Sequence, residues 1–194
     1  MDKCFVVISG LPGSGKSTLG QQLALALDLP FLDKDNILEL LLEAKGLGDS
    51  KWRRALSRES DLILQTEAAR SDGAVLVSHW RLPGMPPNSG TPTRWISALP
   101  YKAINVHCEC PAELSAARFL RRKRHAGHLD HARSHAEILS SIREAARFGS
   151  LDIAPRIRVD TSQSPDLNAL VRELSTALAY CKTAMKSEPC SNSS

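Results

Sequence analysis

The architecture of this 194-residue chain can be worked out from one stretch near its start, Val6-Val7-Ile8-Ser9-Gly10-Leu11-Pro12-Gly13-Ser14-Gly15-Lys16-Ser17-Thr18. A short β-rich run leads into a glycine-rich turn that satisfies the pattern G-x-x-x-x-G-K-[ST]. An apolar-periodic segment from about Ser17 to Leu27 follows, as expected for a helix. Glycines in such a turn let backbone N–H groups point inward around phosphate oxygens, and the helix adds its positive dipole end. The order of strand, loop and helix therefore predicts a nucleotide-phosphate site.

The side chains of this loop have separate predicted roles. Lys16 can reach the β- and γ-phosphates of a bound nucleotide, and the Ser17 hydroxyl can ligate Mg²⁺. The alternative is a glycine-rich turn with a chance lysine, and the complete motif between a strand and a helix argues against it. The predicted nucleotide-binding set is Gly10, Gly13, Ser14, Gly15, Lys16, Ser17 and Thr18.

Strand-like and helical segments alternate along the rest of the chain. The predicted strands cover 6–8, 30–32, 74–77, 103–106 and 156–159, and the predicted helices include 17–27, a stretch from about 37, 52–70, one opened by Pro111 and one opened by Ser164-Pro165. This order predicts an α/β fold in three layers, with helices flanking a parallel five-stranded sheet and ligands at the carboxyl ends of the strands. We expect one domain over residues 1–181, a small lid at about 121–135, and a disordered polar tail over 182–194.

Composition and charge exclude several classes of protein. Hydrophobic residues make up 42% of the chain and charged residues 24%, which is ordinary globular usage. No apolar run approaches the roughly 20 residues of a membrane-spanning helix, and the first apolar run is too short for a signal peptide. A net charge of +4 allows anionic ligands but does not favour nucleic acid. Five cysteines, an odd and sparse number, indicate reduced thiols and a cytoplasmic protein.

The acidic residues that phosphoryl transfer needs are expected after the second strand, in Phe31-Leu32-Asp33-Lys34-Asp35. Extended residues alternate in direction, so Asp33 and Asp35 are predicted to project to the same side. One carboxylate can then hold Mg²⁺ while the other meets the acceptor hydroxyl. In the alternative interpretation Asp35 caps the helix that begins near Ile37, a role compatible with catalysis. The third strand leads to Ser78-His79-Trp80 without an acidic residue, and the sequence has no Asn-Lys-x-Asp motif, so a GTPase is not favoured.

The loop and the acidic segment resemble those of P-loop small-molecule kinases, especially gluconate kinase and shikimate kinase. Both families have an early Gly-x-x-Gly-x-Gly-Lys-Ser/Thr loop and a Phe-x-Asp-x-Asp segment after the second strand. The order of elements is similar over about residues 3–180. Chloramphenicol phosphotransferase and zeta-toxin-like kinases have related layouts. The resemblance implies the P-loop NTPase fold, ATP and Mg²⁺ as cofactors, Asp33 as a metal ligand, and Asp35 as the substrate-binding residue and catalytic base.

A basic, histidine-rich segment lies further along the chain, where Arg118, Arg121, Arg122, Lys123 and Arg124 lead into His125-Ala126-Gly127-His128. A cationic helix end followed by a glycine-containing loop suits a lid that closes over transferring phosphates, and the segment resembles the lid of gluconate kinase. Arg121 and Arg124 are the predicted catalytic lid arginines. A solvated helix end, favoured by the dipole, is the alternative. Metal binding by His131 and His135, or by Cys108-x-Cys110, is not favoured because no further ligand pair accompanies either set.

The acceptor is expected at the strand ends, where this class of fold binds ligands. His79 and Arg81 are the predicted substrate contacts, and a proline-rich loop covers residues 81–93. The segment Asp160-Thr161-Ser162-Gln163-Ser164 resembles the region that borders adenine in the kinases named above.

These observations together predict an ATP- and Mg²⁺-dependent kinase that phosphorylates a hydroxyl of a small molecule. ATP and a small hydroxylated acceptor are its expected partners, with no membrane. Two alternatives stay open. One is an ATP-binding regulatory or toxin-like module that acts on a protein partner through the 81–93 loop and exposed tryptophans. The other is a kinase of nucleic-acid 5′ ends, which the mild charge makes the weaker candidate.

Overall fold

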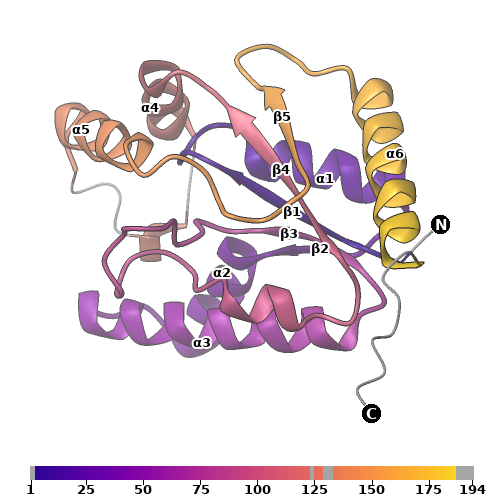
Figure 1. The fold of residues 1–194 in the computed structure, drawn as a ribbon. Coiled ribbons are helices and arrows are strands. Elements are labelled where there is room, and N and C mark those ends of the chain that lie inside the picture. The colour runs from indigo at the N-terminus through magenta and orange to yellow at the C-terminus, as the bar shows by residue number, and fades with distance from the viewer. Residues whose placement is uncertain (1–2, 123–124, 129–132, 187–194) are drawn as a thin grey trace.

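The computed structural model describes residues 3–122, 125–128 and 133–186, and Figure 1 shows how their helices and strands are arranged. In chain order the elements are β1 (Phe5–Gly10), α1 (Lys16–Leu27), β2 (Phe31–Asp33), α2 (Lys34–Lys45), α3 (Ser50–Arg70), β3 (Ala74–Val77), the 3₁₀ helix η1 (Arg94–Ala98), β4 (Ala103–Glu109), α4 (Ala112–Arg121), the 3₁₀ helix η2 (Ala126–His128), α5 (His135–Ala146), β5 (Arg156–Asp160) and α6 (Leu167–Lys186).

The five strands form one parallel sheet in the order β2-β3-β1-β4-β5, which confirms the predicted fold class. β1 lies at the centre and is hydrogen-bonded to β3 on one side and β4 on the other. Its residues Phe5 to Ile8 are fully buried, as expected for a strand that is covered on both faces. Because all strands run the same way, their carboxyl ends meet at one edge of the sheet.

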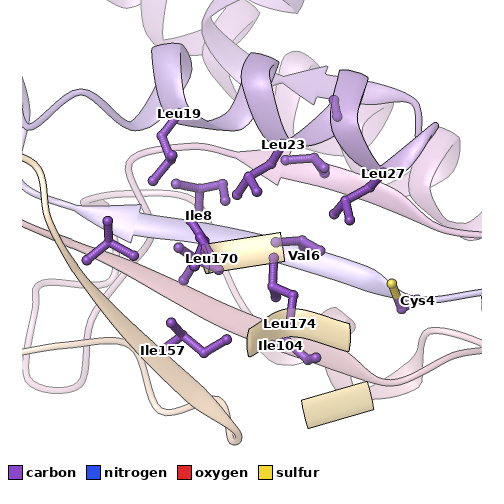
Figure 2. Close-up of a cluster of buried hydrophobic side chains, with 14 of the residues drawn as sticks. Cys4, Val6, Ile8, Leu19, Leu23, Leu27, Ile104, Ile157, Leu170 and Leu174 are labelled. Carbon is purple, nitrogen blue, oxygen red and sulfur yellow. The ribbon is translucent and has the colours of Figure 1, made fainter. Parts of the chain in front are cut away.

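Two apolar layers cover the sheet, and the side chains of β1 alternate between them. Val6 and Ile8 face the layer that holds α1 and α6, whereas Phe5 and Val7 face the layer that holds α3 and η1. Figure 2 shows Leu19, Leu23 and Leu27 of α1 packed against the first of these faces. Burial of these two layers fixes the sheet and, with it, the position of the strand ends.

Two smaller apolar clusters lie beside the strand ends. One joins α4 to α5 through Ala116, Phe119, Ile138 and Ile142. The other joins α2 to α3 through Leu38, Leu42 and Leu56. The helices on either side of the carboxyl edge are thus packed as separate pairs.

Three local expectations differ from the structure. α6 begins at Leu167, with Asp166 accepting a hydrogen bond from the Ala169 N–H, so the Ser164-Pro165 pair does not open it. The helix continues to Lys186, into the segment predicted as a tail, and residues 187–194 lie outside the described residues. Trp80 is buried and not exposed, and its indole N–H donates to the Ile8 carbonyl at 2.7 Å.

None of the described helices is long and apolar enough to cross a bilayer.

Candidate active site

The phosphate loop (residues 10–17) connects the central strand β1 to the first turn of α1. Gly15 is the N-cap of α1 in a left-handed conformation, and no side chain caps the helix there. The first N–H groups of α1 therefore stay available for an anion. Lys16 turns back over the loop, and its Nζ donates to the carbonyls of Gly10 at 2.9 Å and Leu11 at 2.7 Å. Burial lowers the pKa of Lys16 to about 8.

Close packing against α4 holds the loop in place. A Cβ at Gly13 would lie 2.2 Å from the Ser115 carbonyl oxygen, and Gly13 has a positive φ of 81°. Ser14 is fully buried beneath the loop, and its Oγ has no hydrogen-bond partner among the described residues. The loop is thus seated on α4 as well as on the sheet.

Ser17 and Asp33 meet directly below the loop. The Ser17 hydroxyl donates to Asp33 Oδ2 at 2.6 Å, and the other carboxylate oxygen of Asp33 accepts from the Asp35 backbone N–H at 2.9 Å. Burial raises the pKa of Asp33, although the Ser17 hydrogen bond opposes this shift. A buried carboxylate next to a hydroxyl is an all-oxygen donor set of the kind Mg²⁺ prefers, so these residues fit the predicted metal role.

The acidic pair is built differently from the sequence prediction. β2 ends at Asp33, which is the N-cap of α2, and Asp35 already lies in the first helical turn. The two carboxylates therefore come from the junction of a strand and a helix, not from one extended segment. The capping alternative falls on Asp33 and not on Asp35. Both residues nevertheless line the same cleft.

This cleft has a volume of about 760 Å³ and lies at the carboxyl edge of the sheet. The phosphate loop and the acidic pair form its floor, α4 and α5 form one wall, and α3 with the 84–89 segment forms the opposite side. Arg53 of α3 lines it, and the Arg53 Nε is buried without a hydrogen-bond partner among the described residues. Arg53 is not among the predicted substrate contacts, because the sequence does not distinguish it from Arg54 and Arg58 near the start of the same helix.

Two arginines near the C-terminal end of α4 line the cleft, and the predicted Arg121 is not one of them. Arg118 and Arg122 line it, whereas Arg121 is exposed and is not among the lining residues. Arg118 donates to the carbonyls of Thr161 at 2.6 Å and Ser162 at 2.9 Å, which fixes the segment after β5. Arg124 lies outside the described residues. Arg122 is the C-cap of α4 with an extended backbone, and the spacing of the arginines in the sequence does not distinguish it from Arg121, since i,i+3 and i,i+4 residues both share a helical face.

The loop after β3 brings one of the two predicted substrate contacts to the cleft. His79 lines it, and its surroundings lower the pKa of the imidazole to about 4, mainly through loss of hydration and next through the charge of Lys16. His79 is therefore neutral at physiological pH. The structure does not bring Arg81 there: its guanidinium donates to the carbonyls of Ser89 at 2.8 Å and Gly90 at 3.4 Å and closes its own loop.

Part of the predicted lid contacts α2. His128 is buried, and its Nε2 lies 2.8 Å from Glu39 Oε1. The backbone of Gly127 lies so close to Leu42 that an added Cβ would sit 2.5 Å from its side chain. Residues 123–124 and 129–132, including His131, lie outside the described residues. Within the described ranges no group of three His, Cys, Asp or Glu side chains could hold a metal ion.

A smaller cavity of about 340 Å³ adjoins the cleft at His79 and lies behind the phosphate loop. Burial raises the pKa of Cys108 there to about 12, so this cysteine is a thiol and not a thiolate ligand. Ser9 lies between Asn105 and His107 on the cavity wall, at 2.7 Å and 2.9 Å from their side chains.

Comparison with known proteins finds likeness to kinases in the segment that carries this site. A family model for shikimate kinase matches residues 12–71, which include residues 12–17 of the phosphate loop, the acidic pair and Arg53. A cytidylate kinase of Ignicoccus hospitalis is 33% identical over 122 residues, covering 60% of this chain and 63% of that protein. A shikimate kinase of Corynebacterium glutamicum is 41% identical over 71 residues, covering 36% of this chain and 42% of that protein. The chain thus spans less than two thirds of these curated relatives.

A solved structure extends the likeness over nearly the whole chain. The protein, from Chloroflexus aurantiacus and assigned as a kinase, superposes with a TM-score of 0.72 at 26% identity and covers 92% of this chain and 97% of its own. The likeness therefore includes the α4, α5 and β5 segments that the sequence match to the shikimate kinase model leaves out.

Proposed function

We propose that the chain is a P-loop small-molecule kinase, similar to shikimate kinase, and that it moves the γ-phosphoryl group of ATP to a hydroxyl of a small molecule. One observation carries the proposal. Lys16, Asp33 and Asp35 line one cleft, so a phosphate-binding loop, a metal-binding carboxylate and a second carboxylate face the same space. Such a transfer needs positioning and charge stabilisation more than covalent chemistry, and these residues supply both.

The nucleotide phosphates would be held by the N–H groups of residues 13–18 and by Lys16. The Lys16 ammonium exchanges its loop carbonyls for phosphate oxygens and neutralises charge on the transferring group. Arg122 lines the same cleft, and its charge is felt at Lys16. Arg122 is thus the described α4 arginine best placed for the charge-neutralising role predicted for Arg121 and Arg124.

Ser17 and Asp33 would hold Mg²⁺. The ion, when bound, neutralises phosphate charge during transfer. What the chain itself supplies is a pair of oxygen ligands already 2.6 Å apart, with Asp33 fixed as the cap of α2.

Asp35 would orient the acceptor and take the proton of its hydroxyl as the oxygen attacks the γ-phosphorus and ADP leaves. The negative charge of Asp35 is felt at both Lys16 and His79, so all three groups border one space. The neutral imidazole of His79 adds a hydrogen-bonding group without a competing positive charge.

The acceptor side of the cleft indicates a class of molecule. The buried, unpartnered Nε of Arg53 suits an anionic group on the acceptor. Met85, Pro86 and Phe148 also line the cleft, and a Cβ added at Gly84 would lie 3.6 Å from the Phe148 ring. We propose an acceptor with one anionic group, one reactive hydroxyl and a partly apolar body.

The test is ADP release with Mg²⁺-ATP across hydroxylated compounds, comparing ring acids and sugar acids with molecules that carry an apolar group. Lys16→Ala is the blank and should lose several decades of kcat while keeping its fold. A fully active Lys16→Ala enzyme would refute the assignment. Asp35→Asn should abolish transfer and still bind ATP, and loss of ATP binding in that variant would point to a structural or metal role instead.

A second candidate differs in its acceptor. The cytidylate kinase match covers more of this chain than the shikimate kinase match does, and it favours a nucleotide as the phosphoryl acceptor. Adding cytidylate and other nucleoside monophosphates to the panel separates the two. Turnover with these alone would favour the second candidate.

A further inference from the structure

A buried ionic network lies directly behind the acidic pair, and the function proposed above leaves it without a role. Lys34, the residue between Asp33 and Asp35, places its Nζ 2.7 Å from Asp61 Oδ1 of α3. Both side chains are about one tenth exposed, at 11% and 12%. An ion pair this far from water is held in place far more strongly than one at the surface.

Asp61 Oδ1 also accepts a hydrogen bond from the segment that follows β3. Thr91 donates its hydroxyl to Asp61 Oδ1 at 2.8 Å, so the Ser78 hydroxyl, 2.5 Å from Thr91 Oγ1, must be the donor to Thr91. Ser78 follows β3 and lines the cleft next to His79. One oxygen of Asp61 thus ties the start of α2 and the loop after β3 to the middle of α3.

The strand that presents the acidic pair needs such an anchor. β2 has three residues and lies at the edge of the sheet, bonded to β3 alone. A short edge strand does not by itself fix the direction in which the chain leaves it. The Lys34–Asp61 contact fixes the first residue of α2 and therefore the turn that carries both catalytic carboxylates.

The Lys34–Asp61 ion pair also determines the position of the positive charge of Lys34. Lys34 has a long flexible stem, and the carboxylates of Asp33 and Asp35 are its immediate neighbours in sequence. Its charge is felt at His79, so it borders the site although it does not line the cleft. An ammonium group released from Asp61 would be drawn to these carboxylates and would compete with Mg²⁺ for them.

We propose that Asp61 is a positioning residue for phosphoryl transfer, which holds Lys34 away from the acidic pair and anchors the turn that presents it. The inference rests on the proposed function, since it assigns Asp33 to the metal and Asp35 to the acceptor. Loss of the Asp61 charge should raise the Mg²⁺ concentration that supports half-maximal nucleotide binding, because Lys34 then pairs with the site carboxylates.

The experiment compares four proteins with the wild type: Asp61→Asn, Lys34→Met, the double variant, and Glu59→Gln. Asp61→Asn keeps the size and the Thr91 contact, and should raise the half-maximal Mg²⁺ for ATP binding by about 10- to 100-fold, the usual effect of losing a partner that orients a metal ligand. The double variant should bind Mg²⁺-ATP better than Asp61→Asn, because the competing ammonium is gone, but it does not regain the anchor of the turn. Lys34→Met also loses that anchor and should raise the Mg²⁺ requirement, by less than Asp61→Asn does.

Glu59→Gln is the matched control, because the Lys45–Glu59 pair joins the same two helices at 2.5 Å but is exposed. It should match the wild type in Mg²⁺ requirement. ATP binding by calorimetry over a Mg²⁺ series is the main readout, with melting temperature and circular dichroism to confirm folding. If Asp61→Asn does not fold, the double variant and Lys34→Met still test the anchoring role, because an unchanged Mg²⁺ requirement in both would overturn it.

The inference is overturned if Asp61→Asn binds Mg²⁺-ATP like the wild type, or if the double variant is no better than Asp61→Asn. In either case the role of Asp61 is structural. Failure of the proposed function is a separate result: a wild-type protein that binds Mg²⁺-ATP but turns over no acceptor leaves the binding measurements readable.

Discussion

At the scale of single residues, Lys16 carries the clearest electrostatic signature of nucleotide binding. The phosphate loop withdraws its ammonium group from water and lowers its pKa to about 8. Bound phosphates favour the charged form, so binding must take up a proton wherever the free protein has lost one. ATP affinity should therefore be flat below about pH 7 and fall above about pH 8, approaching tenfold per pH unit.

Calorimetry in two buffers of different ionisation enthalpy measures this proton uptake. Lys16→Arg is the control, since a guanidinium keeps its charge over the whole range. The affinity of Lys16→Arg should be lower but should not change with pH in this way. Equal slopes for the two proteins would show that another group is responsible.

At the scale of secondary-structure elements, two effects on the phosphate loop can be measured separately: its packing against α4 and the strain of its left-handed glycines. Gly13 and Gly15 both have positive φ values, 81° and 93°. An added Cβ would meet the Ser115 carbonyl at 2.2 Å from Gly13, but from Gly15 only the Thr161 side chain lies within reach, at 3.9 Å. Alanine at Gly15 therefore adds left-handed strain of about 1–2 kcal/mol, whereas alanine at Gly13 adds the same strain and a clash.

Gly13→Ala should consequently lose more stability than Gly15→Ala and should also displace the loop from α4. We expect ATP affinity to fall in both variants and the free energy of unfolding, measured with urea, to fall distinctly more in Gly13→Ala. Similar losses of stability in the two variants would mean that the contact with α4 does not support the loop.

The elements themselves were largely predictable from the sequence, and the exceptions have physical reasons. β1 and β3 are continuous apolar runs because both faces of the sheet are covered, so their periodicity is plain. The sequence predicts that the chain stays extended through Asp35 after the second strand, because no residue pattern marks a strand that turns into a helix within a single residue. The start of α6 was placed at Ser164-Pro165, since a Ser-Pro pair and the following Asp166 are both acceptable helix starts.

The site was predictable only where it is local in sequence. The phosphate loop and the acidic segment are contiguous motifs, so Lys16, Ser17, Asp33 and Asp35 could be named in advance. Arg53 enters the cleft from α3 and Asp61 reaches Lys34 from the same helix, and both contacts depend on how the helices pack. Contacts between residues that are far apart in the sequence cannot be recognised from a single sequence.

At the scale of the whole molecule, the cleft lies between two bodies that are packed separately. The α4–α5 cluster and the α2–α3 cluster share no buried apolar residue among those described. The sheet fixes both, and near the cleft the η2 segment reaches α2 through Gly127 against Leu42 and His128 against Glu39. The described part of the predicted lid is thus attached to the helix that carries the acidic pair.

Removal of Glu39 should therefore loosen that attachment more than it weakens the fold. The His128 side chain is fully buried, and loss of its carboxylate partner should cost about 1–3 kcal/mol at this contact. In Glu39→Ala we expect amide exchange at residues 126–128 to speed up by about tenfold or more, since about 1.4 kcal/mol corresponds to a factor of ten. Exchange in β1 and β3 should not change. Glu43→Ala, an exposed change on the same helix, is the control and should leave all three regions as in the wild type. Uniform acceleration across the sheet would mean that Glu39 supports global stability, and unchanged exchange at 126–128 would mean that the Glu39 contact does not hold η2.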